Sequence, residues 1–382
     1  MGRTILLGSG KGNAFIHPMN QKAKRCFVFE ERLVPDGMED RLCRRRFMNI
    51  ALILPPVGPA RGNRTTVLRW ARGMESLGHE VNCAEPSECS RIRRADLVHG
   101  HHALHTGLSA VALGQCFSAP VVISLGGTEL YDERENAAAQ SMGEIFRQVQ
   151  GVLIPHEAQA DRLRQLVESI PPTFVVPRGV KSSSQGKSHL SPSGFRVLMI
   201  GAIRPVKGQL EVLRVLAGIR DLPTGFSLLI RGAVADSDYG QKVSHLASQL
   251  DFVEIEEPIS STGMEAVYAR SHALLNYSHH EGASNAILEA WAAGLPLAAS
   301  DVPGNRELLR GAPDAVARLL RPGDRDALSA WFEELSLDSL GKHESRSRQA
   351  RAYVQERHSL EQEMEALLRA YTDTLLRSEV GE

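Results

Sequence analysis

Short apolar runs alternate with amphipathic segments from Met48 to the end of the chain. Runs of this length are typical of buried strands, and the first half holds them at 48–54, 79–83, 96–99, 120–125, 151–154 and 173–177. Between the first two runs, the segment from Thr65 to Leu77 has the spacing of an amphipathic helix. Its apolar side is formed by Val67, Leu68, Trp70, Ala71, Met74 and Leu77. Strands that alternate with helices in this way predict a parallel sheet with helices on both faces.

A second series of the same kind follows residues 182–194, which are rich in serine and resemble an interdomain linker in composition. The strands predicted beyond the linker are 195–200, 226–231, 252–255, 273–276, 296–299 and 316–320. We therefore predict an α/β protein with one domain at 48–181, a second at 195–358 and a last helix within 359–382. Open parallel sheets bind ligands beyond the carboxyl ends of their strands, so both domains should face one cleft.

The first 47 residues differ from this pattern. They are basic and irregular, with Arg44, Arg45 and Arg46 in a row, and we interpret residues 1–47 as a disordered extension. The run Gly8-Ser9-Gly10-Lys11-Gly12 resembles a phosphate-binding loop only superficially. It lacks the first glycine of that loop and the Ser or Thr that holds magnesium. Met48 is therefore expected to open the first domain.

Composition narrows the classes of function. The 382 residues carry a net charge of −1 and 5% aromatic residues, which argues against a nucleic-acid partner. The five cysteines are odd in number and form no C-x-x-C pair, which favours a reduced, cytoplasmic setting and disfavours zinc. No apolar run approaches the roughly 20 residues of a membrane-spanning helix, and the start lacks the apolar core of a signal peptide. We expect a cytoplasmic globular protein, and the sequence predicts no oligomeric state.

Candidate chemistry is densest in residues 279–294, which read His-His-Glu-Gly-Ala-Ser-Asn-Ala-Ile-Leu-Glu-Ala-Trp-Ala-Ala-Gly. A helix should begin near Ser284, because small polar residues favour helix starts, and its free N–H groups would seat a phosphate. Glu281 precedes this start, and Glu289 lies one to two turns inside the helix. Two carboxylates beside a phosphate seat suit a ligand with a diphosphate and hydroxyl groups. A nucleotide-sugar is such a ligand.

Two cations, Arg204 and Lys207, follow the first strand of the second series. Cations placed there would stabilise the negative charge that develops on a diphosphate leaving group. Arginine suits a bidentate grip, whereas lysine acts as a point charge. The alternative is that both are ordinary solvated surface residues.

In this order along the chain, these motifs resemble the donor site of retaining glycosyltransferases with the GT-B fold, in particular the large family-four group. The resemblance includes the loop Pro303-Gly304-Asn305-Arg306-Glu307. It implies two Rossmann-like domains, a nucleoside-diphosphate sugar as donor, no metal or other cofactor, and a last helix that crosses back onto the first domain. It also implies that Glu289 binds the ribose and Glu281 the transferred sugar. The alternative is an amphipathic helix in an unrelated α/β domain.

Two segments of the first domain indicate a narrower group within this family. The segments Gly62-Asn63-Arg64-Thr65-Thr66 and Gly126-Gly127-Thr128-Glu129 resemble selenosugar synthases and related glycosyltransferase-one-domain proteins. The chain departs from the synthases at Ala283-Ser284 and at residues 99–103. We predict a small polar acceptor, with selenophosphate as one such acceptor, because backbone amides and the Arg64 guanidinium would form an anion seat.

The site prediction is then as follows. Catalytic roles fall to Arg204, Lys207 and Glu281; donor binding falls to Gly62, Gly282, Ala283, Ser284, Asn285 and Glu289; acceptor binding falls to Asn63, Arg64, His102 and Thr128.

Several alternatives stay open. His99, His101, His102 and His105 crowd one strand end, where they could bind a metal, bind a sugar or acceptor, or be solvated imidazoles. Asp236-Ser237-Asp238 matches a metal-binding D-x-D of another transferase fold. The acceptor could also be a hydroxyl of a glycan, lipid or natural product. Rival functions are a non-catalytic nucleotide-sugar-binding protein and a nucleotide-sugar epimerase.

Overall fold

The computed structural model describes residues 47–58, 62–131, 135–182, 194–219, 222, 225–338 and 340–380. The predictions made for residues 1–46, including the phosphate-like loop, lie outside the described residues. The same is true of the predicted linker, except for its end residues Ser182 and Gly194.

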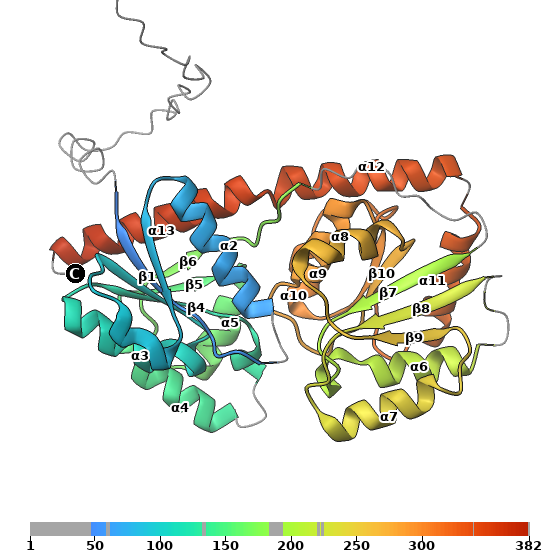
Figure 1. The fold of residues 1–382 in the computed structure, drawn as a ribbon, viewed down its shortest axis with the longest axis horizontal. Coiled ribbons are helices and arrows are strands. Elements are labelled where there is room, and N and C mark those ends of the chain that lie inside the picture. The colour runs from blue at the N-terminus through green and yellow to red at the C-terminus, as the bar shows by residue number, and fades with distance from the viewer. Residues whose placement is uncertain are drawn as a thin grey trace, which may run out of the picture. The chain divides into compact units, whose positions relative to one another are not determined.

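The described chain forms two six-stranded sheets, and every neighbouring pair of strands is parallel (Figure 1). The strands of the first sheet are β1 (Asn49–Ile53), β2 (Glu80–Ala84), β3 (Leu97–His101), β4 (Val121–Ser124), β5 (Gly151–Ile154) and β6 (Thr173–Val175). Those of the second are β7 (Phe195–Ile200), β8 (Phe226–Arg231), β9 (Val253–Glu256), β10 (Ala273–Asn276), β11 (Leu297–Ser300) and β12 (Ala317–Leu320). The orders are β2-β1-β3-β4-β5-β6 and β12-β11-β10-β7-β8-β9. All twelve predicted strands are confirmed.

Helices connect the strands on both faces of each sheet (Figure 1). The first half contains α2 (Gly62–Ser76), α3 (Ala103–Phe117), α4 (Glu135–Phe146) and α5 (Glu157–Leu166), with short 3₁₀ turns η1 (Pro86–Arg91) and η2 (Thr128–Tyr131). The second half contains η3 (Pro205–Lys207), α6 (Gln209–Ala217), α7 (Ser237–Ala247), α8 (Ser261–Ala269), α9 (Asn285–Ala293), α10 (Pro303–Leu309) and α11 (Arg325–Ser336). The last two helices are α12 (Leu340–Arg357) and α13 (Leu360–Val380).

The predicted bounds of helix α2 were wrong at both ends. The helix begins at Gly62, not Thr65, because its first turn is polar and leaves no trace in the apolar spacing. At the other end, Leu77 lies in the turn after Ser76 and is 48% exposed, so it does not belong to the buried side. The buried apolar residues of the helix are Val67, Trp70, Ala71 and Met74.

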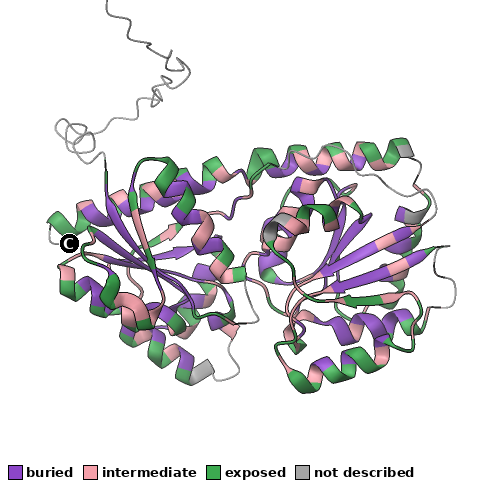
Figure 2. Cartoon of the chain, viewed as in Figure 1, coloured by how far each residue is buried: buried purple, intermediate pink, exposed green. Residues whose placement is uncertain are grey.

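Each sheet is packed on both faces, and its central strands are the most deeply buried part of the chain, whereas the edge strands β2, β6, β9 and β12 are partly exposed (Figure 2). In the first sheet, α3, α4 and α5 cover one face, and α2 covers the other. Strands buried on both faces are expected in parallel sheets. This explains why the strands stand out in the sequence as nearly continuous apolar runs.

The C-terminal helix belongs to the core of the first sheet. Helix α12 packs on α9 in the second half, whereas α13 packs on α2. Within α13, Met364, Leu367 and Tyr371 join the same buried cluster as Trp70 of α2. The chain therefore crosses between the halves a second time, between α12 and α13.

The two crossings lie side by side. Val180, which ends the first half, forms a parallel bridge with Ser359, which lies between α12 and α13. The backbones approach so closely that a Cβ on Gly179 would lie 2.4 Å from the Ser359 carbonyl oxygen. Only glycine is compatible with this contact.

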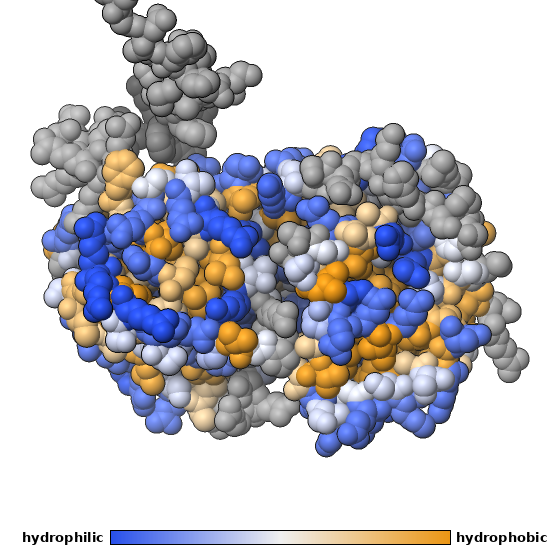
Figure 3. All heavy atoms as spheres, in the orientation of Figure 1, coloured by the Kyte–Doolittle hydropathy of each residue, from blue (hydrophilic) through white to orange (hydrophobic). Residues whose placement is uncertain are grey.

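The described surface mixes charged and apolar side chains (Figure 3). The most exposed large apolar side chains include Val57, Leu108 and Leu337, which lie in different parts of the chain. Isolated exposures of this kind are ordinary on protein surfaces. Among the described residues, no helix has both the length and the apolar content that crossing a membrane requires.

Candidate active site

Helix α9 begins at Asn285 with Ser284 as its N-cap residue, as the sequence predicts. The Ser284 side chain does not cap the helix. Its hydroxyl instead accepts a hydrogen bond of 3.0 Å from Asn276 Nδ2, at the end of β10. The first N–H groups of α9 therefore keep no side-chain partner from this residue, and such a helix start attracts an anion.

Glu281 lies next to this helix start and is held by three groups. Lys207 Nζ donates to Glu281 Oε1 at 2.5 Å, Ser278 Oγ at 2.8 Å and Asn276 Nδ2 at 3.4 Å. Burial alone would raise the pKa of the Glu281 carboxyl, but the Lys207 charge and these hydrogen bonds hold that pKa below its usual value. The structure thus brings two predicted catalytic residues, Lys207 and Glu281, into one ion pair.

Arg204 and Lys207 stand at the two ends of a tight turn that follows β7. Arg204 is the N-cap residue of η3, and Lys207 is its last residue. Gly208 follows with a φ of +66°, and a Cβ there would lie 2.4 Å from the Tyr277 carbonyl oxygen. The Nε of Arg204 is buried without a hydrogen-bond partner among the described residues. A buried unpaired donor on a cation is a reason to expect an anionic ligand at this turn.

Glu289 is oriented by a tyrosine from a neighbouring helix. The Tyr268 hydroxyl, on α8, donates to Glu289 Oε2 at 2.8 Å. Burial raises the pKa of the Glu289 carboxyl, and burial together with the Glu289 charge raises the pKa of Tyr268 well above its usual value. Tyr268 could not be predicted from the sequence, because the contact joins residues that are 21 positions apart on two different helices.

The two predicted acceptor segments lie together. A Cβ on Gly126 would lie 2.9 Å from the Asn63 amide, so Asn63 covers the Gly126 backbone. His102 Nε2 and Thr128 Oγ1 are 3.0 Å apart. All three side chains thus stand near the carboxyl ends of β1, β3 and β4.

Arg64 is placed differently from the predicted anion seat. Its Nη1 forms an ion pair of 2.8 Å with Glu85 and also donates to the Pro55 carbonyl oxygen. The guanidinium charge is therefore already matched by a carboxylate. The assignment of Arg64 to the acceptor stays a prediction, and the structure gives this residue another partner.

The histidines near β3 are buried, so the interpretation as solvated imidazoles was wrong for His99, His101 and His102. His99 bonds to Tyr371 and Ser124, and His101 shares the same Ser124 hydroxyl. Burial and the nearby Arg178 charge lower the pKa of His99 to about 3 and that of His101 well below its usual value. Both rings are therefore neutral hydrogen-bonding groups.

Asp236 has a structural role. Its carboxylate caps α7 by accepting a hydrogen bond of 2.8 Å from the Tyr239 N–H. This is the ordinary use of an aspartate at a helix start. Within the described residues, no group of three or more potential ligands is arranged around a common metal position.

The two halves contact each other through glycine residues on both sides. We call this contact the seam: Gly126 and Gly127 of the first half against Gly282 of the second. A Cβ on Gly127 would lie 2.5 Å from Gly282 Cα, and one on Gly282 would lie 2.4 Å from the Gly126 carbonyl oxygen. His156, the N-cap residue of α5, adds a hydrogen bond of 2.7 Å between its Nε2 and the Gly282 carbonyl oxygen.

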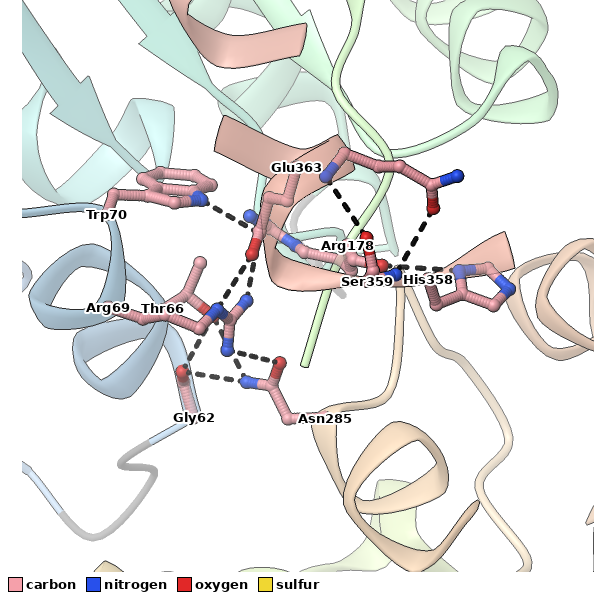
Figure 4. Close-up of polar contacts among 10 residues, drawn as sticks. Gly62, Thr66, Arg69, Trp70, Arg178, Asn285, His358, Ser359 and Glu363 are labelled. Atoms are coloured by element: carbon pink, nitrogen blue, oxygen red, sulfur yellow. Dashed lines mark hydrogen bonds and ion pairs between the residues drawn. The ribbon is translucent and has the colours of Figure 1, made fainter. Parts of the chain in front are cut away.

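A second contact between the halves surrounds the start of α9 (Figure 4). Asn285 Nδ2 donates to the Gly62 carbonyl oxygen at 3.2 Å and to Thr66 Oγ1 at 3.1 Å. Asn285 Oδ1 accepts from Arg69 Nη1 at 3.3 Å. Gly62 and Asn285, both predicted to bind the donor, are therefore in direct contact across the halves.

Arg69 links this contact to the C-terminal helix (Figure 4). The guanidinium grips the Glu363 carboxylate with two hydrogen bonds, of 2.8 and 2.9 Å, and Trp70 Nε1 adds a third at 2.8 Å. Glu363 is fully buried. Burial lowers the pKa of the neighbouring Arg178 to about 10, although Glu363 opposes this shift. Nothing in the sequence marks Glu363, because its partners lie almost 300 positions away.

Comparison with known proteins agrees with this architecture. Residues 194–338 match the family described as "Glycosyl transferases group 1". "Glycosyltransferase 1 domain-containing protein 1" of Xenopus tropicalis is 24% identical over 276 residues, which is 65% of this chain and 77% of that protein. Sucrose-phosphate synthase of Thermosynechococcus elongatus superposes with a TM-score of 0.71 at 17% identity, covering 85% of this chain and 98% of that one. Anabaena Alr3699/HepE in complex with UDP and glucose gives a TM-score of 0.70 at 15% identity, covering 85% and 100%.

The two parallel sheets and these likenesses define the GT-B fold, so the predicted fold class is confirmed. With the match of its second half to glycosyl transferases group 1, the chain is a glycosyltransferase. The Xenopus relative agrees with the predicted resemblance to glycosyltransferase-one-domain proteins. A particular closeness to selenosugar synthases stays a prediction.

Proposed function

We propose that this enzyme transfers a sugar from a nucleoside-diphosphate sugar to a small polar acceptor, with retention of the anomeric configuration. The observation that carries the proposal is one chain of contacts in the second half. Lys207 binds Glu281, and Asn276 reaches both Glu281 and Ser284 at the start of α9. The Asn276 amide thereby joins the ion pair of Lys207 and Glu281 to the helix start that would bind the phosphate. Such an arrangement suits a diphosphate with a sugar attached.

The proposed chemistry places the diphosphate between the η3 turn and the start of α9. As the bond between C1 and the phosphate oxygen breaks, the electron pair stays on the diphosphate, and the Arg204 and Lys207 charges stabilise it. The acceptor then attacks C1 from the face that the diphosphate leaves, and a hydroxyl acceptor gives its proton to the departing diphosphate oxygen. The ion pair with Lys207 and the hydrogen bond from Ser278 support an orienting role for Glu281, since both make its carboxylate a weaker nucleophile.

A donor screen tests this proposal. Because the Anabaena protein was solved with UDP and glucose, UDP-glucose is the first donor to try, followed by other UDP-, GDP- and ADP-sugars. We expect hydrolysis or transfer with at least one donor, a product of unchanged anomeric configuration by NMR, and undiminished turnover in EDTA. Binding without turnover for every donor would favour a non-catalytic protein. An inverted product would contradict the proposed mechanism.

Selenophosphate is the most specific acceptor that we propose, on the strength of the resemblance of residues 62–66 and 126–129 to selenosugar synthases. A second candidate is a neutral hydroxyl compound. It is favoured by the ion pair of Arg64 with Glu85 and by the neutral imidazoles behind the acceptor segments. Incubation of the enzyme and donor with selenophosphate or with a mixture of polyols, followed by mass spectrometry, distinguishes the two. A glycosylated polyol without any seleno-sugar would end the selenophosphate assignment.

Glu289 and Glu281 should differ in which part of the donor they recognise. Glu289→Ala is expected to weaken binding of UDP-glucose and UDP alike, because the ribose is common to both. Glu281→Ala should lower the affinity for UDP-glucose and turnover, and leave the affinity for UDP nearly unchanged. Calorimetry with both ligands on both variants measures this difference. Equal losses in the two variants would contradict the division of roles.

A further inference from the structure

Buried polar atoms without a hydrogen-bond partner are concentrated at the carboxyl ends of three strands of the first sheet. We call this region the wall. Twelve buried side-chain nitrogen and oxygen atoms in the described part of the chain have no hydrogen-bond partner. Half of them belong to five residues that end or follow β3, β4 and β5, three adjacent strands of the first sheet. These residues are His101, His102, Glu129, His156 and Gln159. Unpaired atoms are rare in folded proteins, so their concentration at the carboxyl ends of neighbouring strands indicates a ligand.

Gln159 is the most unusual member of this group. It lies in the first turn of α5 and is only 1% exposed, yet both its amide nitrogen and its amide oxygen lack a partner. The amide stands at the seam. A Cβ on Gly127 would lie 3.2 Å from Gln159 Nε2, and one on Gly282 would lie 2.9 Å from it. The amide is therefore covered by glycine backbone from both halves, beside the loop that carries Glu281.

A buried amide without partners destabilises the folded state, so a purely structural role does not explain this residue. An amide both donates and accepts, and a sugar hydroxyl does the same. A fully ionised phosphate offers only acceptors and would leave Gln159 Oε1 unpaired. It would also meet the negative charge of Glu129, whose second carboxylate oxygen accepts no hydrogen bond and lies 3.6 Å from His102 Nε2. The chemistry of this wall therefore favours neutral hydroxyl groups over an anion.

We propose that Gln159 is a sugar-binding residue that recognises hydroxyl groups of a sugar held at the seam. The proposal deepens the proposed function and rests on it. Because the glycine backbone of the Gly126-Gly127 and Gly282 loops lies against the amide, a separation of these loops would give a sugar access to it. The hydroxyl groups come either from the sugar that is transferred or from a hydroxylated acceptor.

Gln159→Met, which keeps the length of the side chain, and the shorter Gln159→Leu test the proposal, since both remove its polar atoms. We expect kcat/KM for transfer to fall about tenfold or more, as two hydrogen bonds are lost. The Tm of the free protein should stay unchanged or rise, because a buried unpaired amide has been removed, and the affinity for UDP should not change. Gln165→Leu, at an exposed position of the same helix, is the matched control.

The two sources of the hydroxyl groups give different kinetics. If Gln159 binds the transferred sugar, the variants also lose donor hydrolysis in the absence of acceptor. If it binds the acceptor, hydrolysis is kept and only the acceptor KM rises. Wild-type kinetics in both assays would overturn the inference, and so would a lower Tm with a parallel loss of UDP affinity. Failure of the proposed function itself would appear in the wild type, which would turn over no nucleotide-sugar.

Discussion

Replacing Lys207 with alanine is expected to lower kcat by about 10²–10³ while leaving the fold intact, and Arg204→Ala should act in the same range. Each variant removes a positive charge that stabilises the leaving diphosphate. Lys207→Ala has an additional effect, because Glu281 loses its only ion-pair partner within the described residues. The measurement is kcat with saturating donor, accompanied by thermal unfolding of each variant.

The matched control for this prediction is Lys242→Ala, which removes a lysine from an exposed position on α7. It should leave turnover unchanged. If Arg204→Ala and Lys207→Ala both turn over near the wild-type rate with saturating donor, these residues are not a diphosphate clamp. A loss of activity that follows a loss of folded protein would likewise count against the assignment.

The largest effect on stability is expected at Glu363. Replacing it with alanine should lower the free energy of unfolding by about 3–5 kcal/mol, because Arg69 would be left largely buried without its counter-charge. Arg69 and Trp70 would also lose the three hydrogen bonds that end on this carboxylate. Urea denaturation monitored by tryptophan fluorescence measures the change.

Two further variants make the Glu363 result specific. Glu365→Ala, on the exposed side of the same helix, should change stability little, since its ion pair with Arg369 is exposed to solvent. Glu363→Gln keeps the shape and removes the charge, so its stability should lie between those of the wild type and Glu363→Ala. If Glu363→Ala were as stable as Glu365→Ala, the buried ion pair would not hold α13 against α2.

The fold could be predicted from the sequence because its central strands are buried on both faces and its helices on one. Each strand appears as a short apolar run, and the helix spacing lies between the runs. The start of α2 could not be placed in this way. Gly62 and Asn63 are polar or small, and their contacts with Asn285 and Gly126 arise only when distant loops come together.

The placement of the residues predicted to bind the donor followed more readily from the sequence than the placement of those predicted to bind the acceptor. Glu281, Ser284 and Glu289 lie within one short stretch around the start of α9, so their relative placement depends mainly on local structure. On the acceptor side, Arg64 was interpreted without Glu85, the residue that pairs with its charge. Gln159 gave no signal at all, since an isolated glutamine in an amphipathic helix is ordinary. Its significance depends on burial, which the sequence alone does not show.

The return of α13 to the first sheet means that the boundary between the halves in space is not a boundary along the chain. A gene segment that ends at residue 181 encodes all six strands of the first sheet, yet it omits the helix whose Met364, Leu367 and Tyr371 cover the Trp70 face. Chimaeras that exchange acceptor halves between enzymes of this fold therefore need two junctions, one near residue 181 and one near residue 359. Recombination at a single point would separate a sheet from its own covering helix.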